Sequence, residues 1–356
     1  MKRCVFALLL AAFLAALLVL PARGSDLAGE VEAAAPEAAQ GLSGDDFSGG
    51  LSAIWEQVRE GFGGLLRQGL SGAVQLLVVL VLCGIGETVF VTVEGKRTFN
   101  YLSLAAVAAV VAVSAGEVDQ LIGMGVETIA SLEQFSKSLL PALAAATAAT
   151  GMAGSAAVRQ MATVLFCDVL LTVIHRLLLP FLYVYIGALA AGAMLGDGRL
   201  EAIASLLKKA IAWFLGVLLT LFTLYLSVAG AISGAADAAA VKLAQKAIAT
   251  AVPVVGSIVA GAAETVLAGA GLLKNTIGIF GVLAILATCA LPFVRLGIQY
   301  LLYKAVAFVA GTVAPPGLVK LIGGLGSAFG LVLGMVGGCA MLLTISVLSS
   351  LLAIQG

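Results

Sequence analysis

The stretch MATVLFCDVLLTVIHRLLLPFLYVYIGALAAGAML, residues 161–195, indicates the fold class of this chain. Its charged or imidazole side chains are Asp168, His175 and Arg176. As a helix rising 1.5 Å per residue, the stretch exceeds the hydrocarbon core of a bilayer, which is about 30 Å thick. Because Pro180 interrupts the run, it is either one long kinked helix or two closely spaced spans.

Similar apolar runs occupy most of the chain, at residues 69–93, 100–115, 211–232, 253–273, 276–294, 297–313 and 325–353. Hydrophobic residues make up 62% of the sequence and charged residues 11%, whereas a soluble domain carries about 25% charged residues. A water-soluble fold of this size cannot hide so much apolar surface. We therefore predict an all-α polytopic membrane protein with about six to eight spans and interfacial amphipathic helices.

The N-terminal part has three predicted segments before the multi-span membrane domain at residues 69–356. Residues 1–24 have the charged, apolar and small-residue regions of a signal peptide, with an uncleaved anchor as the alternative. Residues 25–50 have the composition of a flexible exported tail. Residues 51–68 show apolar positions at helical spacing, with Trp55 among them, and are predicted to form an amphipathic interfacial helix.

Basic residues predict which loops face the cytoplasm. Lys96, Arg97, Lys208 and Lys209 fall inside if the signal leads outward, and the acidic segment 116–137 falls outside. Two regions are ambiguous, because residues 139–158 suit a re-entrant piece and residues 235–251 suit an interfacial helix.

The last third leaves the topology open. Arg295 and Lys304 fall outside if every apolar run spans. A hairpin over residues 253–294 that does not fully cross would move these charges inside.

Ionisable groups at membrane depth are costly and therefore suggest function or pairing. Asp168, Thr172, His175 and Arg176 share one stripe of a helix, which suits either a proton relay through His175 or a structural polar seam. Glu264 lies in a segment rich in Gly and Ala. It could line a polar pathway, pair with a lysine or accept an interhelical hydrogen bond.

Glycines recur every four residues in the last apolar run, at Gly326, Gly330, Gly334 and Gly338. Such a groove lets helix backbones approach closely inside a membrane. The pattern predicts tight packing but leaves open whether the partner helix belongs to this chain or to another.

The sequence favours no enzyme class. It has one histidine in total, and its cysteines sit singly in apolar runs or in the leader. It also lacks the phosphate-binding, hydrolase and zinc-protease motifs. We expect no catalytic, cofactor-binding or metal residues and, with a net charge of zero, no nucleic-acid partner.

Three stretches resemble the stage III sporulation protein AE family of endospore-forming bacteria. They are FSKSLLP at residues 135–141, the region around Pro180 with Tyr183, and VPVVG at 252–256, which is followed by Glu264, LLKN at 272–275, Gly278 and Gly281. The resemblance implies a membrane subunit of a secretion-like channel complex in the mother-cell membrane around the forespore. It also implies other membrane and ring-forming subunits as partners and a need for the complex in late forespore development. It transfers no site residues.

A second functional class stays open. Prolines at positions 141, 180 and 253 break apolar runs near Asp168 and Glu264, as in the discontinuous helices around the midplane site of a secondary transporter. A stand-alone transporter is therefore the alternative function.

Overall fold

The computed structural model describes residues 28–94, 99–149, 154–196, 198–233 and 256–352. In these ranges the regular elements are helices, which confirms the all-α prediction. They are the 3₁₀ helix η1 (Glu37–Ala39), α2 (Phe47–Glu94), α3 (Phe99–Ala149), α4 (Gly154–Val173), the π-helix η2 (Ile174–Leu178), α5 (Leu179–Leu195), α6 (Gly198–Ser233), α8 (Gly256–Ala310) and α9 (Pro316–Leu352).

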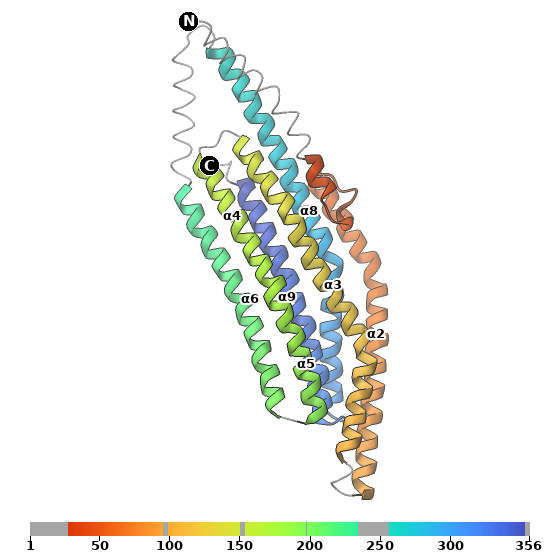
Figure 1. Cartoon of the computed structure of the whole chain (residues 1–356). Coiled ribbons are helices and arrows are strands. Elements are labelled where there is room, and N and C mark those ends of the chain that lie inside the picture. Colours follow the sequence, from red (N-terminus) through yellow and green to blue (C-terminus); the bar gives the residue numbers. More distant parts are fainter. Residues whose placement is uncertain (1–27, 95–98, 150–153, 197, 234–255, 353–356) are drawn as a thin grey trace.

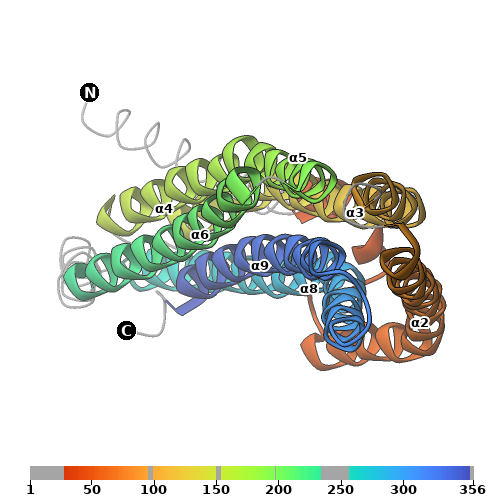
Figure 2. The ribbon, with the colours of Figure 1, turned by 90° about the horizontal axis from the view of Figure 1, so that it is seen from below.

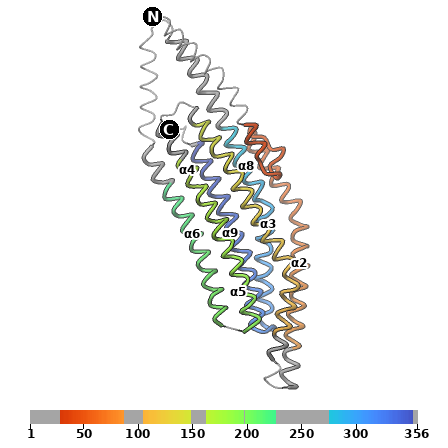
Figure 3. The backbone as a smooth tube through the Cα atoms, viewed as in Figure 1, coloured from red at the N-terminus to blue at the C-terminus, as the bar shows by residue number. Residues whose placement is uncertain are grey.

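Six helical units in the described residues are long and apolar enough to cross a membrane. One of them is formed by α4, η2 and α5 together, because the chain stays helical through Pro180. Successive units run in opposite directions along one bundle (Figure 1). Figure 3 shows the same alternation in the backbone trace. The count agrees with the lower end of the predicted range.

The apolar runs at 276–294 and 297–313, whose topology the sequence leaves open, lie in one continuous helix, α8, as far as Ala310, so the chain does not turn between them. Pro292 lies inside α8 without ending it. Lys304 therefore comes near the end of α8 that leads into α9, close to Lys208 of α6. We call the end of the bundle that carries Lys208, Lys304 and Lys320 the basic end.

We expect the acidic segment 116–137 to lie outside, between spans, but in the structure it is the middle of α3. Its buried large apolar residues recur at helical spacing and are Leu121, Ile122, Ile129, Leu132 and Phe135. This apolar stripe packs along α8 and α9, so the helix continues through the charges. Likewise, residues 51–68 and 69–93 form one continuous helix, α2.

Part of the segment expected to be a flexible tail is folded. Val31 and Ala39 are buried in the main core, and η1 packs against α8. The hydroxyl of Thr276 in α8 donates a 3.4 Å hydrogen bond to Asp45. Small apolar side chains are enough to fold this segment because they pack against the surface of α8. The predicted signal peptide and the predicted interfacial helix at 235–251 lie outside the described residues.

α8 and α9 form the centre of the bundle. In the most apolar window of each, 61% of the residues are buried inside the protein, compared with 17% for α6. Viewed along the bundle, α9 lies beside α8, with α4 and α6 along one side and α2 beyond α8 (Figure 2). The outer helices α3, α5 and α6 all pack on α9. Contacts with α9 therefore show at which level of the bundle a residue of an outer helix lies.

Candidate functional site

The predicted glycine groove is filled by side chains of this same chain. A Cβ at Gly326 would lie 3.0 Å from Cβ of Tyr303, and one at Gly330 would lie 2.9 Å from the Tyr300 ring, both in α8. At Gly334 and Gly338 it would meet Leu215 of α6 at 3.3 and 3.4 Å. One row of glycines therefore serves two partner helices.

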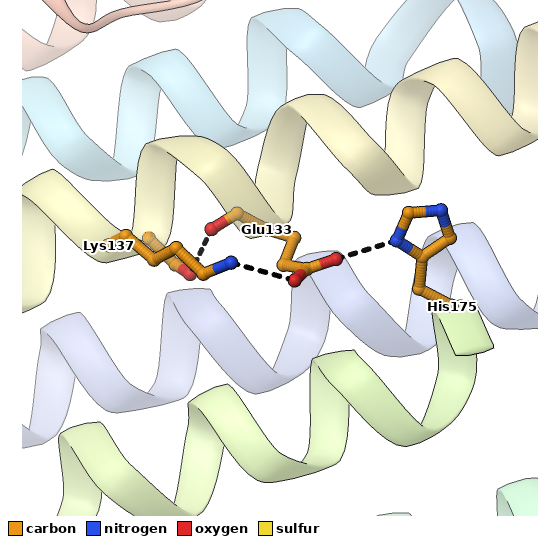
Figure 4. A network of polar contacts seen from close by, with 4 residues as sticks. Glu133, Lys137 and His175 are labelled. Atoms are coloured by element: carbon orange, nitrogen blue, oxygen red, sulfur yellow. Dashed lines mark hydrogen bonds and ion pairs between the residues drawn. The ribbon is translucent and has the colours of Figure 1, made fainter. Parts of the chain in front are cut away.

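A polar network joins α3 to the π-helical segment (Figure 4). Nδ1 of His175 lies 2.7 Å from Oε2 of Glu133, and Nζ of Lys137 donates to Oε1 of Glu133 at 2.8 Å. Glu133 is buried, with 7% of its surface exposed, whereas His175 is half-buried and Lys137 is exposed. Both carboxylate oxygens of a buried acid are thus matched by nitrogen groups, as burial of such a group requires.

Pro180 explains why His175 points toward α3. A proline has no N–H to donate four residues back, and its ring clashes with that carbonyl, here Arg176. The chain relieves this by widening into the π-helix Ile174–Leu178, in which the N–H of Leu179 bonds to the carbonyl of Ile174. The inserted residue shifts the helical register, and His175 then faces Glu133 while Arg176 is exposed.

The other predicted polar residues are placed as follows. Oδ1 of Asp168 is buried and has no hydrogen-bond partner in the described part of the chain. Asp168 and Arg176 both lie close enough to Lys137 to interact with it electrostatically. Glu264 belongs to α8, but its side chain lies outside the described residues. The structure thus gathers the predicted stripe around α3 residues that were not predicted.

A second polar site lies between α2, α3 and α8, nearer the start of α3 than the first. Glu117 accepts hydrogen bonds from the hydroxyl of Tyr303, at 2.9 Å, and from the amide of Gln299. Nearby, the Arg295 guanidinium donates to Gln120 at 3.2 Å. A cavity of about 300 Å³ opens beside these groups, and Gln68, Ser71 and Gln75 of α2 complete its polar lining. We call it the polar cavity.

Gly72 is what allows α2 to close the polar cavity. A Cβ at this position would lie 3.1 Å from Oε1 of Glu117. That contact is tighter than an ordinary van der Waals approach, so any larger residue would push against the carboxylate. Glycine here brings the α2 backbone next to the side chain of Glu117.

The polar cavity continues into an exposed row of polar side chains on α3. This polar face of α3 consists of Asp119, Gln120, Glu127, Gln134 and Lys137, all of them exposed. It lies at the depth of the middle of α9, because a Cβ at Gly125 would contact Val332 and Leu296. Lys320 is the only charged residue of α9. Polar groups thus face outward beside the most apolar part of the bundle.

Sequence reasoning does not identify Glu117 and Glu133 as site residues, because the acidic segment 116–137 suits the outside face. It does not link Gln299 and Tyr303 to them, because these two residues lie far along the chain in α8. One signal could have found the two acids. The apolar residues of that segment keep a helical period, which indicates a helix packed against apolar neighbours. Acids on such a helix need partners, and Lys137 follows Glu133 at the spacing of an ion pair.

Comparisons with known proteins agree with the resemblance. Residues 36–353 match the family described as stage III sporulation protein AE. A curated relative of that name from Bacillus subtilis (strain 168) is 27% identical over 188 residues, or 53% of this chain and 47% of the relative. The match thus spans about half the length of that relative. No solved structure matches the chain. With a family match over nearly its whole length, the chain belongs to the stage III sporulation protein AE family.

Proposed function

We propose that this protein is a non-enzymatic membrane subunit of a sporulation-specific, secretion-like channel complex that links mother cell and forespore. Family membership gives it a role in sporulation, and the six apolar helical units in its described residues suit a membrane location. The complex sits in the mother-cell membrane around the forespore, supports late forespore development, and contains further membrane and ring-forming subunits. The protein needs no cofactor for this role.

The observation that carries the proposal is the polar face of α3 beside the polar cavity. Five polar residues are exposed there at the depth at which α9 is uncharged. Charged side chains at the centre of a bilayer cost roughly 2.5–3.5 kcal/mol each on insertion scales, so such a face is not expected against lipid. Polar residues in membrane helices normally face a water-filled space or another protein. A channel subunit presents such a face toward the pore or toward its neighbours.

Cysteine accessibility in sporulating cells tests this proposal. Gln120→Cys, Glu127→Cys and Gln134→Cys are expected to react with a membrane-impermeant, water-soluble thiol reagent when the complex is assembled. Leu221→Cys and Leu224→Cys on exposed, apolar positions of α6 are the matched controls and should stay unlabelled. Equal protection of both sets, with cells in which the gene is deleted forming normal spores, would overturn the proposal.

A stand-alone secondary transporter is the second candidate, and the polar cavity favours it. A volume of about 300 Å³ suits a small polar solute, and Glu117 and Arg295 offer both charges. Purified protein in liposomes would then take up a solute without partners, and Glu117→Gln would abolish uptake. If the isolated protein takes up no solute, and other sporulation proteins co-purify with it in mild detergent, the channel subunit would be favoured.

A further inference from the structure

Two lysines at the basic end share a single hydroxyl. Nζ of Lys304 in α8 donates to Oγ of Ser327 at 2.7 Å, and Nζ of Lys208 in α6 donates to the same oxygen at 3.0 Å. The two ammonium groups are therefore no more than about 6 Å apart, a distance at which like charges repel. Ser327 lies in α9, so three helices converge on this point.

No carboxylate neutralises this pair in the part of the chain that the structure describes. The remaining hydrogen bond of Lys304 goes to the carbonyl of Gly323, at 2.7 Å. Ser327 also donates to that carbonyl, and Tyr185 of α5 donates to the next one, Gly324. The neutral protein groups near the two ammonium groups are thus already hydrogen-bonded. The remaining N–H donors of Lys208 and Lys304 would suit an anion.

Lys320 provides the contrast at the same end of the bundle. Its Nζ lies 2.7 Å from Oε2 of Glu201, so this lysine has its counter-ion within the protein. Because Glu201 is paired with Lys320, it does not neutralise Lys208 or Lys304. The double positive charge of Lys208 and Lys304 is therefore a feature of the α6–α8–α9 junction, and not of basic residues at this end in general.

The surroundings of the junction are those of a lipid site. Leu301 and Phe308 are spaced three and four residues from Lys304 on the same side of α8, and they expose 64% and 84% of their surface. Basic groups between membrane helices on the side where lysines gather bind anionic lipid headgroups. Exposed apolar side chains beside them suit the acyl chains.

We propose that Lys208 and Lys304, held by Ser327, bind the phosphate of an anionic phospholipid at the junction of α6, α8 and α9. Phosphate oxygens accept short, charge-assisted hydrogen bonds, and one phosphate can bridge two ammonium groups at this separation. The single negative charge of the phosphate offsets part of the charge of the two lysines, and its hydrogen bonds to both link α6 to the central pair. This inference concerns the lipid around the protein, and it holds whether the subunit serves a channel or a transporter.

Native mass spectrometry of the purified full chain tests this site. Phosphatidylglycerol adducts are expected to survive on the wild type better than phosphatidylcholine adducts. Each of Lys208→Gln and Lys304→Gln should weaken phosphatidylglycerol binding roughly fivefold, and the double variant roughly 30-fold. Lys209→Gln and Lys320→Gln, which alter lysines that do not contact Ser327, should leave it within about twofold of the wild type.

Two further arms separate the explanations. The Lys208→Arg/Lys304→Arg variant should retain most of the phosphatidylglycerol binding, which shows that the loss in the Gln variant is not misfolding. Inorganic phosphate alone should raise the melting temperature of the lipid-free protein little. Strong stabilisation by inorganic phosphate that the double Gln variant loses would overturn the assignment to lipid. Unchanged lipid binding by that variant would overturn the site itself.

Discussion

α3 and α6 pack on the same part of the central helix α9 but show opposite surfaces to the outside. Leu215 of α6 lies against Gly334 and Gly338, and Gly125 of α3 lies against Val332. On the outward side, α6 exposes Trp213, Phe214, Leu221 and Leu224, which we call the apolar face of α6. At the same depth α3 exposes Asp119, Gln120, Glu127, Gln134 and Lys137.

This contrast indicates that the bundle is not surrounded by one kind of solvent. The apolar face of α6 matches hydrocarbon, in which its side chains lose nothing by exposure. The polar face of α3 would pay a penalty for each charge held in the same medium. Such a difference supports the proposal that the protein is one piece of a larger assembly.

The largest effect is expected from giving both faces the same charge. Leu221→Asp places a carboxylate in the apolar face of α6 and should destabilise the inserted protein by roughly 2.5–3.5 kcal/mol. Gln134→Asp places one in the polar face of α3, next to existing charges, and should cost less than about 1 kcal/mol. Thermal unfolding of both variants in lipid nanodiscs measures the difference. Equal losses would mean that α3 also faces lipid, and the comparison would fail.

Two glycine-to-alanine substitutions should differ clearly in their effect on stability. Gly326→Ala forces a Cβ to within 3.0 Å of Cβ of Tyr303, an atom that moves only with the α8 backbone. Prising α8 from α9 in this way should cost about 1–3 kcal/mol. Gly216→Ala in α6 enters open space and should be neutral or stabilising by up to about 1 kcal/mol. Unfolding midpoints of the two variants in the same detergent give the answer.

The sequence predicts the fold class because apolar composition leaves few alternatives. The long runs, the glycine row at Gly326–Gly338 and the polar stripe with His175 could all be read directly. It could not show that the glycines serve Tyr300, Tyr303 and Leu215, because that depends on which helices become neighbours. Spacing within one helix does not identify the helix across from it.

The charges of α3 misled the sequence reasoning for a physical reason. Acidic residues usually mark a solvated loop, and four of them lie between Gly116 and Lys137. Here Glu117 and Glu133 are satisfied by Tyr303, Gln299 and His175, which come from distant parts of the chain. Partners of that kind are decided by tertiary packing. They turn an apparent loop into a packed helix.

A smaller effect should distinguish the buried acid of α3 from an exposed one. Glu133→Gln removes the charge that Lys137 and His175 share and should destabilise the protein by about 1–3 kcal/mol. Glu127→Gln on the exposed polar face should change the unfolding free energy by less than about 0.5 kcal/mol. Denaturant titration in detergent can compare the two variants. A larger loss for Glu127→Gln would show that the polar face already has a strong partner within this chain.

The smallest effect is expected at the start of α2, the helix that closes the polar cavity beside α3. Oδ1 of Asp46 accepts hydrogen bonds from the N–H of Gly49 at 2.9 Å and the hydroxyl of Ser48 at 2.8 Å. These bonds, led by that from Gly49, lower the pKa of Asp46 below its ordinary value of 3.8. Because the pKa is lower in the folded state, the stabilisation is present above about pH 4 and is lost as the pH falls through the folded pKa.

Asp46→Asn separates the cap from its charge. Asparagine caps a helix about as well as aspartate, so the variant should match the wild type in stability at low pH, where Asp46 is protonated. At neutral pH the wild type should melt at a slightly higher temperature, because only the ionised carboxylate is also stabilised by the positive end of the α2 dipole. Melting temperatures of both proteins between about pH 3 and pH 7 test this difference. A gap that widened toward acid would contradict it, since a lowered pKa can stabilise the folded protein only while the group is ionised.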